Sequence, residues 1–328
     1  MSPAPPPLAE IVRVLKERDD FLITTHVDPD GDGLGSQCAL YWALTKMGKR
    51  VQLVNSSPLQ RRYRFLTCAS VYRVSDVFPG HEVCLALDAG DLQRIREGIR
   101  REELGFLINI DHHSSNTLYG DLNWVEPTAC AAGEMVYRLI RELPVSPGQE
   151  ILDGIYTALI ADTGRFQYSN TTPQVLRLAA ELVDRGADLA GVSRKLFASE
   201  SEAALKVLRT GLGNLRIHAG GRIGTMTLSR RELAESGAVD DDTENLINFV
   251  RKVDGVELSL FLRERSDGRL KLSLRSKNGV DVSRIAMRFG GGGHPYAAGA
   301  VMEGPLDQAL KTVLEACTAA LLKEHGDG

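Results

Sequence analysis

The sequence contains few cysteines, and none of them has a partner at the spacing of a zinc or redox motif. The five are Cys38, Cys68, Cys84, Cys130 and Cys317, an odd number scattered over 328 residues. Secreted domains held by disulfides use a dense, even set of cysteines, and structural zinc sites use paired thiolates. We therefore expect reduced thiols, an intracellular protein and no structural zinc ion.

The sequence also lacks the apolar segments that direct a protein to or across a membrane. Its first twenty residues have neither the basic region nor the apolar core of a signal peptide. No apolar run approaches the roughly 20 residues that a membrane-spanning helix needs. We expect no membrane partner and a cytoplasmic location.

The charge balance does not favour a protein that holds long nucleic acids. Lys and Arg number 39 and Asp and Glu 43, which leaves a net charge of −4. Long DNA or RNA is held mainly by many contacts between basic side chains and phosphates. A partner of long duplex nucleic acid is therefore not expected. Small anionic substrates remain compatible, because a metal ion or a few arginines can supply positive charge locally.

The length predicts two domains, of which the first alternates strands with helices. Short apolar strands are predicted at 21–27, 50–55, 82–91 and 105–113, and helices at 8–20, 36–49, 128–143, 149–164 and 172–187. This rhythm predicts an α/β domain over residues 1–188 with a doubly wound, mostly parallel sheet.

The second domain is predicted to be smaller and of the α+β class. A charged helical stretch at 192–215 marks a connector, placed at 189–214, and the domain itself is placed at 215–328. Strands are predicted at 221–229, 256–265 and 269–277, and helices at 241–253, 280–289 and 305–324.

Residues 24–36, TTHVDPDGDGLGS, crowd one histidine and three aspartates into a short stretch. Asp28, Asp30 and Asp32 alternate and a glycine follows, as at the start of an EF-hand calcium loop. The twelfth position of such a loop needs a glutamate but is Ala39 here, and a strand precedes the stretch where an EF-hand has a helix. A solvated turn remains open, because Asp-Pro-Asp-Gly is favourable turn chemistry.

Further acids and histidines follow the other predicted elements. Asp88 follows one apolar strand, Asp111, His112 and His113 follow another, and Asp162 ends a helix. Each alone is typical of a cap or a turn. In open α/β sheets, however, ligands bind beyond the carboxyl ends of the strands, and carboxylates crowded there repel one another unless a cation lies among them.

Carboxylates mixed with neutral imidazoles suit Mn²⁺, Mg²⁺ or Fe²⁺ better than a thiolate zinc site does. The available side chains suffice for two divalent ions about 3.5–4 Å apart, an arrangement that cleaves phosphoesters. The candidate metal ligands are His26, Asp30, Asp32, Asp88, His112 and Asp162.

The order of these motifs resembles that of the DHH phosphoesterases. The resemblance rests on HVDPDGDGLGS, LDAGD, DHH and ADTGRF, and on GGGGHPYAAGA, which resembles the glycine-rich signature of the DHHA1 substrate domain. It extends from about residue 8 to about residue 322. The chain looks most like the NrnA-type branch, which comprises bifunctional oligoribonucleases and phosphatases of 3′-phosphoadenosine 5′-phosphate (pAp).

The resemblance implies two metal ions that share one carboxylate, with Mn²⁺ favoured and Mg²⁺ or Co²⁺ as alternatives. The implied ligands are His26 and Asp30 for one ion, Asp32, His112 and Asp162 for the other, and Asp88 as the bridge. Asp28 has no ligand role in the family. His113 is implied to contact the scissile phosphate or to protonate the leaving oxygen, and Asp111 to orient its neighbours.

In the second domain, the resemblance implies substrate-binding residues. They are Arg275, Ser276, Gly291, Gly292, Gly293 and His294. Exposed backbone N–H groups of glycines can hold an anion. A flexible linker remains an alternative for the glycines, and an ordinary strand position for Arg275. Tyr63, Phe166 and Tyr296 are candidates for stacking on a base, with packing as the alternative.

Together these features predict an enzyme that hydrolyses oligoribonucleotides of two to five nucleotides, including linear pApA and pGpG, to mononucleotides, and pAp to AMP. The family resemblance also implies a homodimer. The alternatives are a cyclic dinucleotide (c-di-AMP) phosphodiesterase, a RecJ-like exonuclease on long single strands, and a pyrophosphatase or polyphosphatase. A further alternative is a catalytically inactive binder of nucleotides or metals.

Overall fold

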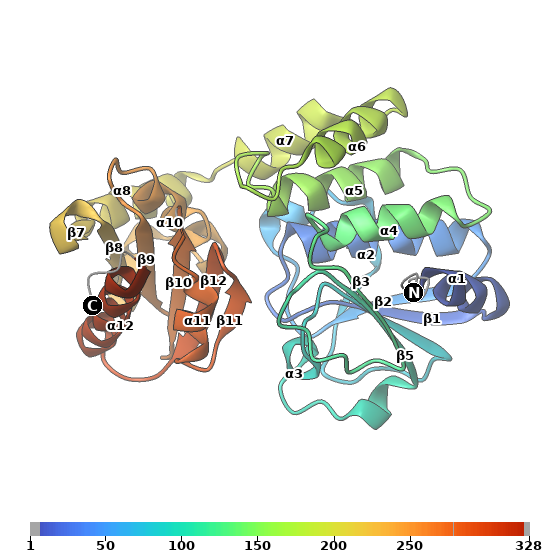
Figure 1. Ribbon diagram of the computed structural model, residues 1–328, viewed down its shortest axis with the longest axis horizontal. Helices are drawn as coiled ribbons and strands as arrows, with labels where there is room; N and C mark the ends of the chain where they lie inside the picture. Colours follow the sequence, from blue (N-terminus) through green and yellow to red (C-terminus); the bar gives the residue numbers. More distant parts are fainter. Residues whose placement is uncertain (1–6, 278, 325–328) are drawn as a thin grey trace. The chain divides into compact units, whose positions relative to one another are not determined.

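The computed structural model describes residues 7–277 and 279–324, and the chain folds into two compact units (Figure 1). The first unit is Met1–Ser199 and the second Glu200–Gly328. The division lies inside the segment 189–214 that the sequence predicts as a connector. The predicted domains begin at residue 1 and end at residue 328, and both of these ends lie outside the described residues.

The first unit is built on a parallel sheet. Over its described residues the strand order is β3-β2-β1-β4-β5-β6, and every neighbouring pair is parallel. This confirms the predicted α/β class. The strands are β1 (Asp20–Thr24), β2 (Arg50–Asn55), β3 (Tyr72–Val74), β4 (Val83–Leu87), β5 (Phe106–Asp111) and β6 (Leu122–Val125).

The edge strands β3 and β6 were not predicted, because three or four residues with mixed exposure carry no apolar pattern.

Helices cover both faces of this sheet, as a doubly wound fold requires. The helices α2, α4 and α5 lie over one face and α3 lies on the other (Figure 1). An apolar cluster fills each face. The helices are α1 (Leu8–Glu17), α2 (Gly31–Lys46), α3 (Leu92–Ile95), α4 (Ala132–Arg141), α5 (Gln149–Asp162), α6 (Pro173–Asp184) and α7 (Leu189–Phe197), with short 3₁₀ turns η1 (Arg61–Tyr63), η2 (Thr67–Val71) and η3 (Arg101–Leu104).

Helix α2 begins earlier than the sequence predicts. The prediction placed its start at residue 36, whereas the structure begins it at Gly31, with Asp30 as the N-cap. The Asp30 carboxylate accepts the backbone N–H groups of Asp32 and Gly33 at 2.9 and 3.3 Å. Three glycines in the first five helical positions lower the helix propensity, so the periodic pattern becomes visible only after them.

These glycines let α2 and α5 approach each other closely. A Cβ atom added to Gly35 would lie 2.3 Å from the carbonyl oxygen of Gly154, and one added to Gly31 would lie 2.6 Å from Cβ of Ala161. Both distances are too short for real atoms, so larger side chains would push the helices apart. The close packing brings the first turn of α2 next to the end of α5, where Asp162 lies.

The second unit is of the predicted α+β class. Over its described residues the strand order is β11-β12-β10-β9-β8-β7, with β8 and β9 parallel and the other neighbours antiparallel. The strands are β7 (Arg216–His218), β8 (Ile223–Leu228), β9 (Leu258–Glu264), β10 (Leu270–Ser276), β11 (Gly292–His294) and β12 (Ala297–Met302). Apolar clusters again lie on both faces.

The helices of this unit are α8 (Glu202–Gly213), α9 (Arg230–Ser236), α10 (Leu246–Arg251), α11 (Val282–Met287) and α12 (Leu306–Glu324), with 3₁₀ turns η4 (Ala219–Gly221) and η5 (Asp240–Thr243). Helix α9 was not predicted, and α10 and α11 are shorter than predicted. The single helical stretch predicted at 192–215 is wrong, because α7 ends at Phe197 and α8 begins at Glu202. Ser201 separates them by capping α8, its hydroxyl accepting the N–H of Ala204 at 2.9 Å.

Along residues 7–277 and 279–324, none of the helices has the length and apolar character needed to cross a bilayer. All five cysteines are buried and form no disulfide in this part of the chain.

Candidate metal centre

The acidic motifs of the first unit meet near β1 and β4, the two strands from which the chain builds the sheet outward in opposite directions. The chain proceeds from β1 outward to β2 and β3, and from β4 outward to β5 and β6. The adjacent strands β1 and β4 are parallel, and doubly wound sheets bind ligands beyond the carboxyl ends of the two strands at such a reversal of direction. His26 follows β1 and Asp88 follows β4, so both lie at this point.

The candidate ligands form two groups, and one side chain, that of Asp88, faces both. Ligand atoms of His26, Asp30 and Asp88 lie within 4.8 Å of one another, and so do those of Asp32, His112 and Asp162. The two carboxylate oxygens of Asp88 face different groups. Oδ2 lies 3.6 Å from Nε2 of His26, and Oδ1 lies 3.5 Å from Nε2 of His112. A carboxylate that bridges two ions needs this arrangement.

Within each group the histidine lies close to the carboxylates. Nε2 of His112 lies 3.4 Å from Oδ2 of Asp32 and 3.4 Å from Oδ2 of Asp162. Nε2 of His26 lies 3.9 Å from Oδ1 of Asp30. These separations leave room for a cation between the nitrogen and oxygen atoms, whose usual distances to a metal are about 2.0–2.2 Å.

Backbone carbonyl groups orient both imidazole rings. Nδ1 of His26 donates to the carbonyl oxygen of Val27 at 2.8 Å, and Nδ1 of His112 donates to that of Ala129 at 3.1 Å. A carbonyl oxygen can only accept, so Nδ1 carries the hydrogen in each ring. Nε2 is then the nitrogen directed to the carboxylates, which is the usual way that proteins present histidine to a metal.

Asp32 is held by the start of a second helix. Its carboxylate is fully buried and accepts the backbone N–H groups of Ala132 and Gly133 at 2.6 and 2.9 Å, where α4 begins. The hydroxyl of Ser36, one helical turn further along α2, donates to it at 3.1 Å. A helix N-terminus stabilises negative charge, so these contacts favour the ionised carboxylate.

The carboxylates nevertheless crowd one another. Burial and the nearby charge of Asp88 raise the pKa of Asp32 well above its ordinary value. Burial also raises the pKa of Asp162 to about 7, and Asp30 and Asp88 add to this effect while His112 opposes it. Without a cation, Asp162 would be partly protonated near neutral pH.

The histidines respond in the complementary way. Burial disfavours the charged imidazolium of His26, but Asp30 and Asp88 outweigh this effect and raise its pKa to about 10. Burial acts against the charge of His112 too, and the carboxylates around it, Asp88 first, raise its pKa well above the ordinary value. The carboxylates thus stabilise positive charge at the centre of the site, and a bound divalent cation would supply that positive charge.

Two carboxylate oxygen atoms give further evidence on whether a metal ion fits this site. Among the described residues, Oδ1 of Asp88 and Oδ2 of Asp162 are buried and accept no hydrogen bond. Buried carboxylate oxygens normally have such a partner, because burial without one is unfavourable. The donor set of imidazole nitrogens and carboxylate oxygens therefore fits divalent ions of the Mn²⁺ and Mg²⁺ type.

Backbone strain marks two of the aspartates. Asp88 and Asp28 have φ angles of 54° and 52°, in the left-handed region that non-glycine residues rarely occupy. At Asp88 the strain accompanies a buried side chain that faces both ligand groups. Asp28 is exposed and belongs to neither group, while its backbone N–H donates to the hydroxyl of Ser57 at 2.8 Å.

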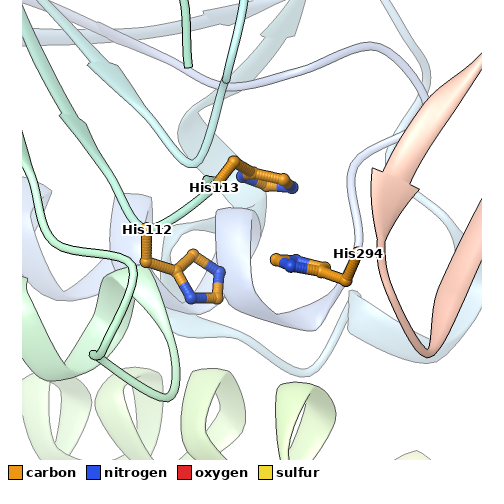
Figure 2. A group of neighbouring side chains, drawn as sticks. All are labelled: His112, His113 and His294. Atoms are coloured by element: carbon orange, nitrogen blue, oxygen red, sulfur yellow. The ribbon is translucent and has the colours of Figure 1, made fainter. Parts of the chain in front are cut away.

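Asp111 and His113 form a pair beside the ligands. Nδ1 of His113 donates to Oδ1 of Asp111 at 2.7 Å, and the Asp111 side chain is fully buried. Figure 2 shows the rings of His112 and His113, which come from adjacent positions of the chain, and their planes are inclined by 67°. The same Nδ1 lies 3.7 Å from Oδ1 of Asp88. His113 therefore lies next to the candidate metal ligands with its ring orientation set by a carboxylate.

The predicted substrate residues of the second unit gather around β12. Arg275 of β10 and His294 of β11 both pair with Ala297 in the sheet, from opposite sides. The ring of His294, which is also drawn in Figure 2, stacks on Tyr296 with centroids 5.4 Å apart. Ser276 ends β10 and is buried.

Close strand pairing explains why Gly291 and Gly293 lack a Cβ atom. A Cβ atom added to Gly291 would lie 2.0 Å from the carbonyl oxygen of Gly299, and one added to Gly293 would lie 2.5 Å from that of Ala297. Gly292 and Gly293 belong to β11, which excludes the alternative that they form a flexible linker. Their role in binding an anion stays a prediction.

Two of the predicted stacking candidates pack inside the first unit. Tyr63 is buried and its ring lies beside Gly31, and the ring of Phe166 lies against that of Tyr156 with centroids 6.4 Å apart. The sequence interpretation missed the role of Ser36, although its spacing of four residues from Asp32 on one helix could have suggested it. It also missed the carbonyl groups that orient the histidines, for which side-chain identity gives no signal.

Two family models match the chain, one in each unit. The model of the DHH family N-terminal domain matches residues 20–159, and that of the DHHA1 domain matches residues 225–321. A relative from Thermus thermophilus, named bifunctional oligoribonuclease and PAP phosphatase NrnA, is 38% identical over 319 residues, which are 96% of this chain and 94% of the relative.

A relative of the same name from Bacillus subtilis is 27% identical over 96% of this chain and 99% of its own length. Among solved structures, an exopolyphosphatase-related protein from Bacteroides fragilis is similar, with a TM-score of 0.86 at 26% identity. That match covers 96% of this chain and 95% of the other.

Proposed function

This chain belongs to the DHH family of phosphoesterases, and from that premise we propose that it uses two divalent metal ions to hydrolyse short oligoribonucleotides and pAp. The observation that carries the proposal is the position of Asp88, whose two oxygens face two separate groups of ligands. A single-ion site would need no such carboxylate. The full-length similarity to relatives named bifunctional oligoribonuclease and PAP phosphatase supports the two substrates.

In this proposal the metal ligands are His26, Asp30, Asp32, Asp88, His112 and Asp162. Ions held there supply charge that stabilises the phosphate in the transition state and lower the pKa of the attacking water. The chain contributes the geometry: carbonyl groups hold the two imidazoles, and the start of α4 holds Asp32.

His113 and Asp111 are proposed to serve the leaving oxygen of the reaction. Hydrolysis adds water to phosphorus and breaks the bond to the leaving oxygen, which must then take up a proton. His113 has one ring nitrogen on Asp111, so its Nε2 is the atom assigned to the leaving oxygen or to the phosphate. Asp111 keeps the ring in this orientation.

The second unit is proposed to hold the end of the substrate that does not react. Arg275 and His294 flank Ala297 on one sheet, and the backbone of Gly291, Gly292 and Gly293 with Ser276 completes the proposed set. Phosphate or terminal-nucleotide contacts from these residues would limit the length of the substrate. The net charge of −4 accords with short substrates, because long strands require an extended basic surface.

Mn²⁺ is the proposed ion, with Mg²⁺ and Co²⁺ as alternatives, because imidazoles and carboxylates occur in both ligand groups. A homodimer in the cytoplasm is proposed as well, since the family resemblance implies the dimer and the five scattered cysteines accord with an intracellular protein.

A substrate panel tests this proposal. Purified protein with Mn²⁺ would be assayed against pAp, pApA, pGpG, c-di-AMP and RNAs from the trimer to about 24 nucleotides. We expect the highest kcat/KM for pAp and the linear dinucleotides, with a steep decline beyond the pentamer. Equal activity on the longest RNA would contradict the short-substrate proposal, and a preference for c-di-AMP would replace it with the cyclic-dinucleotide alternative.

A further inference from the structure

A chain of asparagine side chains lies behind the Asp111–His113 pair, and no residue role given above accounts for it. The side-chain amide of Asn116 donates to Oδ2 of Asp111 at 2.6 Å and to Oδ1 of Asn109 at 2.8 Å. Its carbonyl oxygen accepts the N–H of Leu118 at 2.8 Å. A carboxylate can only accept, so these partners determine which way the Asn116 amide faces.

Asn109 connects this amide to the strand that carries the candidate bridge. It is fully buried in β5, and its amide nitrogen donates to the carbonyl oxygens of Ala86 and Ala89, both at 3.2 Å. These two residues flank the turn in which Asp88 has its strained backbone. The hydroxyl of Tyr119 completes the connection by donating to Ala89 at 2.8 Å. The network therefore joins the segments that follow β4 and β5.

The two oxygens of Asp111 have separate tasks in this network. Oδ2 accepts from Asn116 and Oδ1 accepts from Nδ1 of His113. The terminal torsion of an aspartate is broad, so one contact alone does not hold the carboxylate plane. The Asn116 contact holds it so that Oδ1 remains opposite Nδ1, which places the ring hydrogen on Nδ1 and leaves Nε2 for the reaction.

We propose that Asn116 is a positioning residue for phosphoester hydrolysis, which acts on the leaving oxygen only through Asp111 and His113. The inference rests on the proposed function, because it takes His113 as the group that serves the leaving oxygen. Asn116 itself is not among the proposed metal ligands or substrate contacts. Its removal should therefore lower kcat and leave both KM and metal binding nearly unchanged.

The dependence on the leaving group distinguishes positioning from general damage. The ribose oxygen released from pApA needs a proton, whereas the phenolate released from a p-nitrophenyl nucleotide ester does not. For Asn116→Ala and Asn116→Ser, we expect kcat on pApA to fall about 10- to 100-fold and kcat on the p-nitrophenyl ester to change less than about threefold. Equal losses on both esters, or a loss of bound metal, would overturn the proposal.

Asn123 offers a matched control. It lies in β6, and its side chain makes two hydrogen bonds, accepting the N–H of Gly120 at 2.9 Å and donating to the carbonyl oxygen of Gly120 at 2.7 Å. These bonds do not involve Asp111. We expect Asn123→Ala to leave kcat on both esters unchanged, and a selective loss on pApA in this variant would count against a specific role of Asn116.

A double-mutant cycle tests the route of the effect. If Asn116 acts through His113, Asn116→Ala should cause no further loss of kcat in a His113→Ala background. Independent, multiplicative losses would show that Asn116 acts by another route and would overturn the proposal.

A spectroscopic measurement tests the positioning role without relying on activity. In protein labelled with ¹⁵N-histidine, long-range ¹H–¹⁵N correlations report which ring nitrogen carries hydrogen, and His113→Gln assigns the signal. We expect the Nδ1–H form in the parent and an increased Nε2–H form in Asn116→Ala. Identical spectra would overturn the positioning role. A parent that cleaves no nucleotide would defeat the proposed function, while these spectra would still decide whether Asn116 positions His113.

Discussion

The two units place their candidate functional side chains in different ways. In the first unit most of them are buried where strands end and where helices begin or end, and backbone groups and neighbouring carboxylates hold them, while Asp30 is exposed. In the second unit Arg275 and His294 are half-buried on antiparallel strands of a mixed sheet, and the pairing of both with Ala297 sets their spacing.

This difference indicates a division of tasks. Crowded, mostly buried ionisable groups with shifted pKa values are typical of sites that hold metals or carry out chemistry. Half-buried basic and polar groups on a sheet suit reversible binding of an anionic substrate. Changes in the first unit should therefore act on kcat and metal content, and changes in the second on KM.

The largest effect is expected at Asp88. Asp88→Asn keeps the size of the side chain and removes the charge that both ligand groups share. We expect kcat on pAp to fall by about 10³-fold or more, because metal ligation and charge are lost together. Full activity in this variant would contradict the division of tasks. Circular dichroism and gel filtration would verify that the variant is folded.

Metal binding should also release protons from the first unit. The pKa of His26 is raised to about 10 and that of Asp162 to about 7 in the metal-free site, so both hold protons near neutral pH. A cation must displace these protons. Its affinity should therefore rise with pH until Asp162 is ionised and His26 is neutral even before the cation binds.

Titration calorimetry in buffers of different ionisation enthalpy counts these protons. We expect about one or more protons released per ion near pH 7, and an affinity for Mn²⁺ that increases about tenfold per pH unit for each proton. Affinity independent of pH between about 6 and 8 would show that the site is already deprotonated.

A smaller effect, of a different kind, is expected in the second unit. Arg275→Ala removes a basic group proposed to contact phosphate, so KM for pApA should rise about 10-fold, with kcat within about threefold of the parent. Lys271→Ala is a control on the same strand, since its ammonium group pairs with Glu244 at 3.0 Å. An Arg275 variant with a lower kcat and an unchanged KM would contradict the proposed division of tasks between the two units.

Much of the first unit could be predicted, because its strands are short apolar runs separated by periodic helices. From a parallel sheet it follows that Asp88 and Asp111 lie at one edge although they are distant in sequence. The approach of Asp162 could not be derived in this way. It lies at the end of a helix, and it comes close to Asp32 because glycines allow α2 and α5 to pack closely.

Other features escaped prediction for physical reasons. The groups that orient His26 and His112 are backbone carbonyls, which every residue has and which no side-chain pattern marks. The start of α2 was missed because glycine, which the close packing requires there, has a low helix propensity. In the second unit β12 was missed because its alanines and glycine form a strand only through pairing with β10 and β11.

The most direct test of the central claim is the number of Mn²⁺ ions bound per chain, measured by elemental analysis after equilibrium dialysis of the parent and of Asp88→Asn. If Asp88 joins two ligand groups, the parent should bind two ions with high affinity and the variant at most one. A parent that binds a single ion, or a variant that still binds two with unchanged affinity, would contradict the account.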